Sequence, residues 1–274
     1  MASNVQAATM QDADVLYSVA DQIATITLNR PERMNTISGP MLAQLTQRLL
    51  EADADKNVRV VILTGAGRAF CAGLDLTEMT KPREGGITSG ASNAVDLDLR
   101  NTPPTVLFAM NTPVICALNG SAAGYGMDTA LGCDIRIMAQ SAKMAAAFTK
   151  RGIVPESGGT WFLPRLIGWS KAAELIFTGR TLTAGECVEM GLASKAVPDA
   201  DLPGVARALA LEIAANAPLA VQASKRMMRM GLTETFNDHV HHVFLQLLPL
   251  MRSHDAAEGM RAFMEKRPAE FTGR

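Results

Sequence analysis

The sequence is poor in the features that mark several specialised protein classes. Its 274 residues include only four cysteines, with no CxxC spacing, which excludes a disulfide framework and a cysteine-based metal site. The formal net charge is −1, so no basic field recruits nucleic acid or an anionic membrane. No apolar run reaches membrane-spanning length, and the N-terminus lacks the basic and apolar regions of a secretory signal. We therefore expect a soluble cytoplasmic protein with no nucleic-acid or membrane partner.

What the sequence does contain is enough apolar material for a continuous core. The chain is 48% hydrophobic and 19% charged, which suits one globular domain with a helical appendage. Strand patterns alternate with helical ones in the first part, and from Ser170 the pattern is helical to the end. The expected fold is α/β, with a core over residues 1–200 and a C-terminal helical region for oligomerisation over 201–274. The strands are expected at 15–17, 23–28, 58–63, 113–118 and 135–138, and the first helix at 38–53.

One glycine-rich stretch stands out as a candidate site. The apolar run 113–118 leads into NGSAAGYGMDTALGCD, residues 119–134, which predicts a buried strand, a tight turn and a helix that begins near 122–126. The free N–H groups at the start of such a helix, together with its dipole, favour an anion or a developing oxyanion. Asp128 lies in the predicted first turn, so an acidic side chain faces the same place.

A second stretch repeats this pattern earlier in the chain. The apolar strand 58–63 runs into the glycine-bearing segment 64–76, TGAGRAFCAGLDL. Two such turns, at the ends of consecutive buried strands, are expected to lie side by side on one sheet edge. Two converging N–H donors are the arrangement that an oxyanion hole requires.

A third candidate is Glu156, in the turn Pro155-Glu156-Ser157-Gly158-Gly159 that enters a helix. Apolar residues flank this turn, so we expect its carboxylate to be partly desolvated, which raises the pKa. An acid with a raised pKa is suited to proton transfer near neutral pH. The alternative role for Glu156 is to cap the following helix.

Other motifs are weaker. Gly65-Ala66-Gly67 begins like a dinucleotide-binding GxGxxG, but Phe70 occupies the place of the third glycine. His239 and His242 share a helical face without a nearby acidic or thiol ligand, so no metal site is expected. Ser121 lacks the GxSxG elbow of a nucleophilic serine.

Taken together, the motifs resemble those of the enoyl-CoA hydratase/isomerase family, the crotonase superfamily. The resemblance covers nearly the whole chain. The motifs that carry it, in family order, are ITLNRPERMNTIS, VVILTGAGRAFCAGLDL, PVICALNGSAAGYGMDTALGCDIRI, RGIVPESGGTWFLPRLIG, FTGRTLTAGECVEMGLASKAVP and EGMRAFMEKRPAEF. It implies a spiral of ββα units, an acyl-CoA thioester substrate, and C-terminal helices that form homotrimers, often paired into homohexamers.

The resemblance also implies roles for individual residues. The oxyanion hole falls on the backbone N–H groups of Leu74 and Tyr125, where each donor stabilises the transition state by about 3 kcal/mol. No separate cofactor is implied, because CoA is part of the substrate. The expected CoA contacts are Arg33, Ala72, Asp75, Leu76, Phe263 and Lys266. The loop 81–93 and the helix 94–110 are expected to line the acyl pocket.

The sequence departs from the hydratase pattern at the catalytic acids. Family hydratases use two glutamates; the first falls on Asp128 and the second on Phe148, which cannot transfer a proton. Glu156 instead matches the acid of family members that shift a double bond. The resemblance therefore favours a 3-enoyl to 2-enoyl-CoA isomerase with Glu156 as base and Asp128 as auxiliary acid. The alternatives are an enoyl-CoA hydratase that uses Asp128 and Glu156 together, and a non-catalytic acyl-CoA-binding scaffold.

Overall fold

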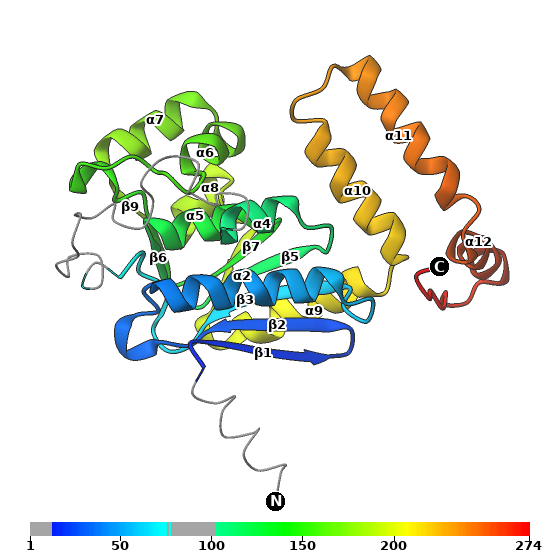
Figure 1. Cartoon of the computed structure of the whole chain (residues 1–274), viewed down its shortest axis with the longest axis horizontal. Helices are drawn as coiled ribbons and strands as arrows, with labels where there is room; N and C mark the ends of the chain where they lie inside the picture. Colours follow the sequence, from blue (N-terminus) through cyan, green and yellow to red (C-terminus); the bar gives the residue numbers. More distant parts are fainter. Residues whose placement is uncertain (1–12, 76, 78–101) are drawn as a thin grey trace, which may run out of the picture.

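Two sheets form the core of the computed structural model, which describes residues 13–75, 77 and 102–274 (Figure 1). The larger sheet has the strand order β1 (Val15–Ala20), β2 (Ile23–Leu28), β3 (Val60–Gly65), β5 (Val114–Leu118), β7 (Ile135–Ala139) and β10 (Lys195–Val197). The smaller sheet has the order β4 (Ala69–Cys71), β6 (Ser121–Ala123), β8 (Lys143–Ala145) and β9 (Thr181–Thr183). β1 and β2 form the antiparallel hairpin that the sequence predicts.

The two sheets are connected in a repeating order. Strands β3, β5 and β7 lie parallel in the larger sheet, and each is followed by a short strand, β4, β6 or β8, in the smaller one. β6 leads into α5 (Tyr125–Gly132), and β8 leads through a loop into α6 (Gly159–Ile167). This succession is the spiral of ββα units that the resemblance implies, so the predicted fold class is confirmed.

Local sequence explains why α2 (Gly39–Ala54) covers the sheet. The Ser38 side chain accepts a hydrogen bond from the N–H of Met41 and so caps the helix, and proline follows in the first turn. Met41, Leu45 and Leu49 lie on one face, and all three are fully buried. Burial of each such side chain stabilises the fold by about 2 kcal/mol.

The expectation that everything after Ser170 is helical is wrong at two places. β9 pairs antiparallel with β8, and β10 pairs parallel with β7. Both strands have only three residues, too short to show a period, and it is the neighbouring sheet edge that orders them. The helices around them are α7 (Trp169–Thr178), α8 (Ala184–Met190) and α9 (Leu202–Ala214).

The helix expected before Met110 is described only in its last part. α4 (Pro103–Ala109) has both prolines in its first turn, where their missing N–H groups cost no hydrogen bond. The two prolines therefore stand in the first turn of α4. The loop 81–93 and residues 94–101 lie outside the described residues.

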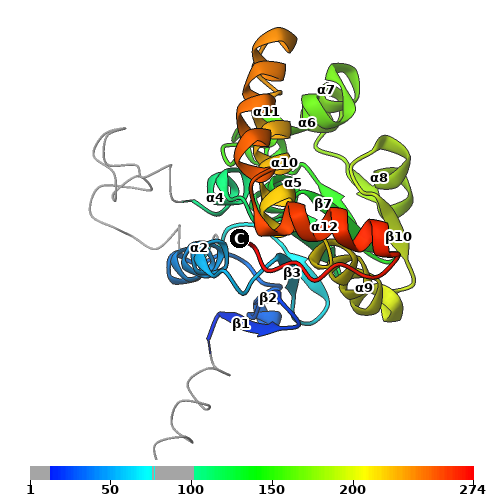
Figure 2. The same cartoon turned by 90° about the vertical axis from the view of Figure 1, so that its right-hand side faces the viewer.

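The C-terminal region has two parts. α9, which follows the predicted boundary at residue 200, packs against the larger sheet through Leu202, Ala206 and Ala210. α10 (Pro218–Met230), α11 (Phe236–Leu250) and α12 (His254–Glu265) then extend away from the core on one side (Figures 1 and 2). No single helix in the described ranges is long and apolar enough to cross a membrane. Within the same ranges, one pair of consecutive helices, 199–214 and 218–230, has enough length and apolar character when the two are taken together, but the pair is bent by 103°.

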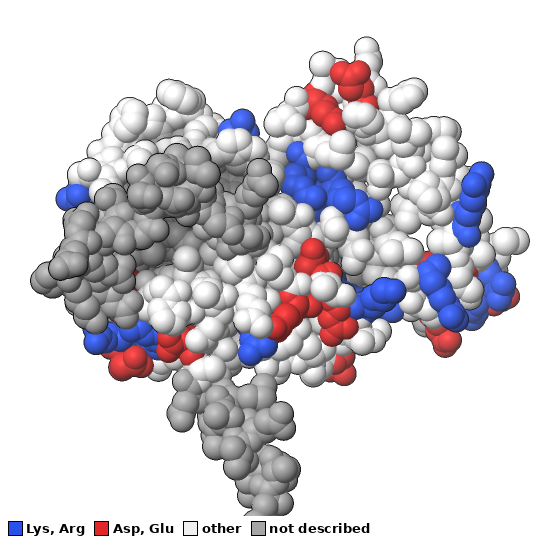
Figure 3. All heavy atoms as spheres, viewed as in Figure 1, with Lys and Arg blue, Asp and Glu red and all other residues white. Residues whose placement is uncertain are grey.

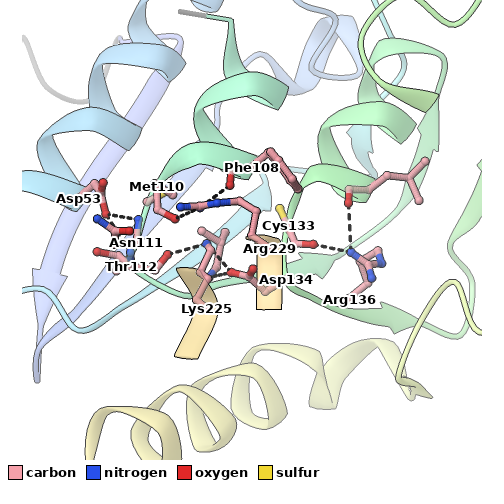
Figure 4. Close-up of polar contacts among 12 residues, drawn as sticks. Asp53, Phe108, Met110, Asn111, Thr112, Cys133, Asp134, Arg136, Lys225 and Arg229 are labelled. Atoms are coloured by element: carbon pink, nitrogen blue, oxygen red, sulfur yellow. Dashed lines mark hydrogen bonds and ion pairs between the residues drawn. The ribbon is translucent and has the colours of Figure 1, made fainter. Parts of the chain in front are cut away.

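Basic side chains attach α10 to the core. Lys and Arg side chains gather where α10 meets the core (Figure 3). Lys225 Nζ lies 2.7 Å from Asp134 Oδ2 and donates to the carbonyl of Thr112 at 3.0 Å (Figure 4). Arg229 donates to the carbonyls of Phe108 and Met110, at 2.6 and 3.1 Å. These contacts place charge at the C-terminal end of α4, where a cation is favoured by the helix dipole.

Replacement of Gly126 by alanine tests how closely α5 packs on β4. A Cβ at Gly126 would lie 2.2 Å from the carbonyl oxygen of Cys71, so backbone must move. We expect the free energy of unfolding in urea to fall by about 1–3 kcal/mol. Gly185→Ala in α8 is the matched control, because no atom lies within 4 Å of its Cβ position; it should leave stability unchanged or raise it slightly. Equal effects of the two substitutions would contradict the close contact.

Candidate active site

The structure brings the two glycine turns together. β4 and β6 pair in parallel, with Ala69 opposite Ser121 and Cys71 opposite Ala122. Gly73, just after β4, has φ +106°, and a Cβ there would lie 3.1 Å from the carbonyl oxygen of Ala123. A side chain at position 73 would therefore press on the backbone two residues before Tyr125, and its absence lets the segment that carries Leu74 approach the start of α5.

Two backbone N–H groups in these turns are available to a ligand. Around Leu74, the N–H of Ile37 donates to the carbonyl of Gly73 and the N–H of Asp75 donates to the carbonyl of Ile37. The N–H of Leu74 takes no part in this bridge, and Tyr125 is the first residue of α5. Within the described ranges neither N–H donates to a protein acceptor. Both stand where the positive end of the α5 dipole adds to their attraction for negative charge.

Two asparagine side chains hold these turns in place, a role that the sequence analysis missed. Asn119 Oδ1 accepts from the N–H of Gly65, and its Nδ2 donates to the carbonyl of Gly67 at 2.9 Å. Asn35 is fully buried and donates to the carbonyls of Ala66 and Ala69. For Asn119 the available signal was its place directly after a buried strand, a position that favours side-chain bonds to turn backbone.

Asp128 is the most perturbed carboxyl of the site. It is 1% exposed, and its Oδ2 accepts from Ser157 Oγ at 2.7 Å and from the N–H of Gly159 at 3.1 Å. Burial raises the pKa of Asp128 from its ordinary 3.8 to about 6, although the hydrogen bonds from Ser157 and Gly159 lower it in part. Oδ1 is buried and has no hydrogen-bond partner in the described part of the chain.

The contacts of Asp128 also place Glu156. Ser157 and Gly159 follow Glu156 by one and three residues, so the turn that carries Glu156 is fixed to α5 on its C-terminal side. The expectation that Glu156 is partly desolvated is wrong: its side chain is exposed, and Ile153 and Val154 before it are 50% and 62% exposed. The buried carboxyl with the raised pKa is Asp128. The charge of Glu156 nevertheless acts on both Asp128 and Tyr125 and raises the pKa of each.

Phe148 lies beside the same site. Its side chain is 4% exposed, and a Cβ at Gly124 would lie 3.9 Å from two of its ring atoms. The position where the resemblance expects a second hydratase glutamate is thus an apolar wall next to the start of α5. Glu156 is the carboxylate that the structure brings near Asp128 in its place.

The expected CoA contacts divide into two groups. Near the first glycine turn, Arg33 is exposed with its guanidinium 3.5 Å from Thr77 Oγ1, and Ala72 is partly buried. Asp75 is 5% exposed, and its carboxylate accepts hydrogen bonds from Thr77 and from Arg30 at 3.1 Å. The hydrogen bond from Thr77, followed by that from Arg30, lowers the pKa of Asp75. Its side chain therefore has protein partners already. Leu76 lies outside the described residues.

The structure does not bring Phe263 and Lys266 to this place within one chain. Phe263, on α12, is 86% exposed, and Lys266 ends the helix in a left-handed conformation. α12 lies at the opposite end of the molecule from β6 and α5 (Figure 1). Within a single chain, the N–H groups of Leu74 and Tyr125 therefore lie far from Phe263 and Lys266, the two CoA contacts expected in the C-terminal region.

The histidines form a small cluster away from the glycine turns. His239 Nδ1 lies 3.2 Å and His242 Nδ1 2.9 Å from the carboxylate oxygens of Glu234, so the expectation that no acidic side chain lies near the two histidines is wrong. In the described ranges, no group of three or more His, Cys, Asp or Glu side chains has an arrangement that could hold a metal ion.

Comparison with known proteins places this geometry in one family. A sequence model described as enoyl-CoA hydratase/isomerase matches residues 18–274. The chain belongs to the enoyl-CoA hydratase/isomerase family. An acyl-CoA thioester substrate is consistent with this family, and the crotonase-type fold of its solved relatives agrees with the spiral described above.

Its relatives carry out more than one reaction. The chain is 38% identical to the 1,2-epoxyphenylacetyl-CoA isomerase of Escherichia coli over 265 residues, which cover 95% of this chain and 98% of that one. It is 33% identical to the short-chain-enoyl-CoA hydratase of Clostridium acetobutylicum over 262 residues, 95% and 98% of the two chains. The structure of an enoyl-CoA hydratase from Bacillus anthracis matches with a TM-score of 0.86 at 35% identity, covering 96% of this chain and 100% of that one.

The raised pKa of Asp128 predicts a pH dependence of stability. Below about pH 3.8 this carboxyl is protonated in both states; between 3.8 and about 6 the unfolded chain loses the proton first. The free energy of unfolding therefore falls as pH rises through this window, by about 3 kcal/mol in total. Asp128→Asn removes this contribution, so its stability relative to the wild type should increase between pH 4 and pH 7. Urea unfolding of both proteins at pH 4, 5, 6 and 7 measures the difference; a constant difference would refute the perturbed carboxyl.

Proposed function

We propose that the protein is a 3-enoyl to 2-enoyl-CoA isomerase in which Glu156 is the base and Asp128 an auxiliary acid. One observation carries the proposal: Ser157 and Gly159 bind Asp128 and so hold the turn of Glu156 beside the start of α5. The N–H groups of Leu74 and Tyr125 lie at that same place. A base, an oxyanion hole and a buried acid are the groups that a double-bond shift requires.

The reaction moves one proton and one double bond. Glu156 removes a proton from C2 of the 3-enoyl thioester, and the electrons of that bond pass towards the thioester oxygen to give a dienolate. The N–H groups of Leu74 and Tyr125 hold the developing negative charge on that oxygen. Glu156 returns the proton at C4, and the double bond comes to lie between C2 and C3. Atoms and charge balance with no other reactant.

The environment of Glu156 suits a base that serves two carbons. Its exposed side chain has rotational freedom, so one carboxylate reaches C2 and then C4 without a second acid. Phe148 leaves an apolar wall where a hydratase would hold a water molecule between two carboxylates. Asp128, with its pKa raised to about 6 and its Oδ2 fixed by Ser157, can accept or release a proton near neutral pH close to the reacting chain.

Hydration is the second candidate, and the same contact favours it. Because Asp128 binds the residue next to Glu156, the two carboxyl groups are neighbours, and such a pair can activate a water molecule for addition to a 2-enoyl thioester. The family includes both hydratases and isomerases, so the choice between them rests on the products formed.

Product analysis in heavy water distinguishes the candidates. With 3-hexenoyl-CoA, we expect conjugated 2-hexenoyl-CoA and deuterium in the product, and a loss of at least about 100-fold in rate for Glu156→Gln. With 2-hexenoyl-CoA, we expect little 3-hydroxyacyl product. Glu212→Gln, an exposed glutamate on α9, is the matched control and should leave the rate unchanged.

Other outcomes of this experiment select the alternatives. If 3-hydroxyhexanoyl-CoA is the main product and both Glu156→Gln and Asp128→Asn abolish it, the protein is a two-carboxylate hydratase. If neither substrate reacts although both bind tightly, the protein is an acyl-CoA-binding scaffold and the isomerase proposal fails.

We also propose that the protein assembles into homotrimers or homohexamers through α10–α12, as the resemblance implies. α11 has no buried residue in the single chain, and its apolar side chains are exposed in a continuous stripe. They include Val240, Phe244, Leu245, Leu248 and Met251, which are 40–61% exposed. A groove of about 840 Å³ between α10 and the core adds Trp161, Phe162 and Met228. Apolar surface of this extent is typical of an interface. In such an assembly a second copy would supply Phe263 and Lys266 to the CoA site.

Sedimentation of Phe244→Asp tests the assembly. A charge at this position, 57% exposed in the single chain, should break the oligomer because an interface buries it without a partner. We expect the wild type to sediment as three or six copies and the variant as one. Leu50→Asp on α2, which is 46% exposed, is the control and should sediment like the wild type. A monomeric wild type would contradict the proposal.

A further inference from the structure

Two buried polar atoms of the site have no hydrogen-bond partner among the residues that the structure describes. Tyr125 is 7% exposed, and its hydroxyl oxygen is buried without a hydrogen bond in the described part of the chain. Asp128 Oδ1 is likewise buried without a hydrogen bond in the described ranges. Buried tyrosine hydroxyls normally find a partner, because an unpaired buried hydroxyl is costly. The resemblance gives a role only to the backbone N–H of Tyr125, which leaves the phenol unexplained.

The two atoms belong to one turn of one helix. Tyr125 and Asp128 are three residues apart at the start of α5, so their side chains project from the same side of the helix. Their charges interact, since Asp128 contributes to raising the pKa of Tyr125. No hydrogen bond joins them directly, so each atom needs a further polar partner, and a single polar atom between the two side chains would satisfy both.

The chemistry of the surroundings determines what this atom must be. Burial, followed by the charge of Glu156, raises the pKa of Tyr125, so its phenol stays protonated and donates. The nearby Cys71 thiol is also neutral, because burial raises its pKa to about 12. Asp128 Oδ2 already accepts from Ser157 and Gly159, which leaves Oδ1 as an acceptor when the group is ionised. A bridging atom must therefore accept from Tyr125 and donate to Asp128, and a hydroxyl oxygen does both.

We infer that the Tyr125 hydroxyl and Asp128 Oδ1 together bind one hydroxyl oxygen beside the oxyanion hole. The inference rests on the proposed acyl-CoA site and extends it to the substrate. The oxygen is either a hydroxyl carried by the acyl chain or a water molecule that reacts with it. Tyr125 is then a binding residue in two ways, through its backbone N–H for the thioester oxygen and through its phenol for the second oxygen.

A site built in this way discriminates between acyl chains. A chain with a hydroxyl satisfies both protein atoms, whereas a plain chain that displaces water leaves them unpaired. We expect the wild type to bind 3-hydroxybutanoyl-CoA or 4-hydroxybutanoyl-CoA at least about 10-fold more tightly than butanoyl-CoA. Titration calorimetry with each ligand separately measures this ratio.

Tyr125→Phe removes the hydroxyl and keeps the ring. Because the hydroxyl has no partner to lose among the described residues, the melting temperature of the variant should equal or exceed that of the wild type. Its preference for the hydroxylated ligand should disappear. Tyr17→Phe is the matched control, since Tyr17 lies on β1 in the larger sheet, and it should retain the wild-type preference. Tyr125→Leu repeats the test if the phenylalanine variant does not fold.

The second source of the oxygen gives a different result. If the bound oxygen is water, the wild type shows no preference between the ligands, but it hydrates 2-butenoyl-CoA, and Tyr125→Phe lowers the ratio of hydration to isomerisation at least about 10-fold. If the wild type shows no preference and Tyr125→Phe leaves the product ratio unchanged, the inference is overturned while the acyl-CoA site stands. If the wild type binds no CoA ester, the proposed function itself fails.

Discussion

The site depends on how closely two backbone segments approach where side chains are missing. A Cβ at Gly120 would lie 2.2 Å from the carbonyl of Arg68, and one at Gly126 would lie 2.2 Å from the carbonyl of Cys71. The second ββα unit therefore packs directly on the backbone of the first. This contact places the start of α5 against the turn after β4, and the N–H groups of Leu74 and Tyr125 become neighbours as a consequence. The hydrogen bonds of Asn35 and Asn119 then fix the turns in this position.

The same packing buries a carboxyl group. Asp128 lies in the first turn of α5, and the loop from the following unit closes over it, with Ser157 and Gly159 donating to one of its oxygens. Burial makes the charged form unfavourable, and the hydrogen bonds only partly compensate. Stability is thus lower than the fold would otherwise allow at neutral pH, at the place where the proposed reaction uses a proton donor or acceptor. Perturbed groups of this kind gather at functional sites.

The C-terminal helices differ from the core in how they bury their apolar side chains. α10 is attached to the core by Lys225 and Arg229, through one carboxylate and three backbone carbonyls. α11 and α12 expose apolar side chains that a single chain does not cover. A core element buries its apolar face within its own chain, whereas these helices present theirs outward, which is the observation on which the proposed assembly rests.

The sequence by itself determined the fold class and most of the elements, because local patterns act over a few residues. Alternation in β2, the Ser38 cap of α2 and the apolar runs of β3 and β5 are readable without tertiary context. It also identified Asp128, Glu156 and the two glycine turns, since glycines after buried strands are a local signal. Only the tertiary structure decided their environment. Which side chains are buried depends on which segments pack over them. In this fold Asp128 is covered and Glu156 is left exposed. The three-residue strands β9 and β10 exist because a sheet edge was there to pair with them. The Tyr125 hydroxyl lost its solvent to packing, which no pattern within the helix could indicate.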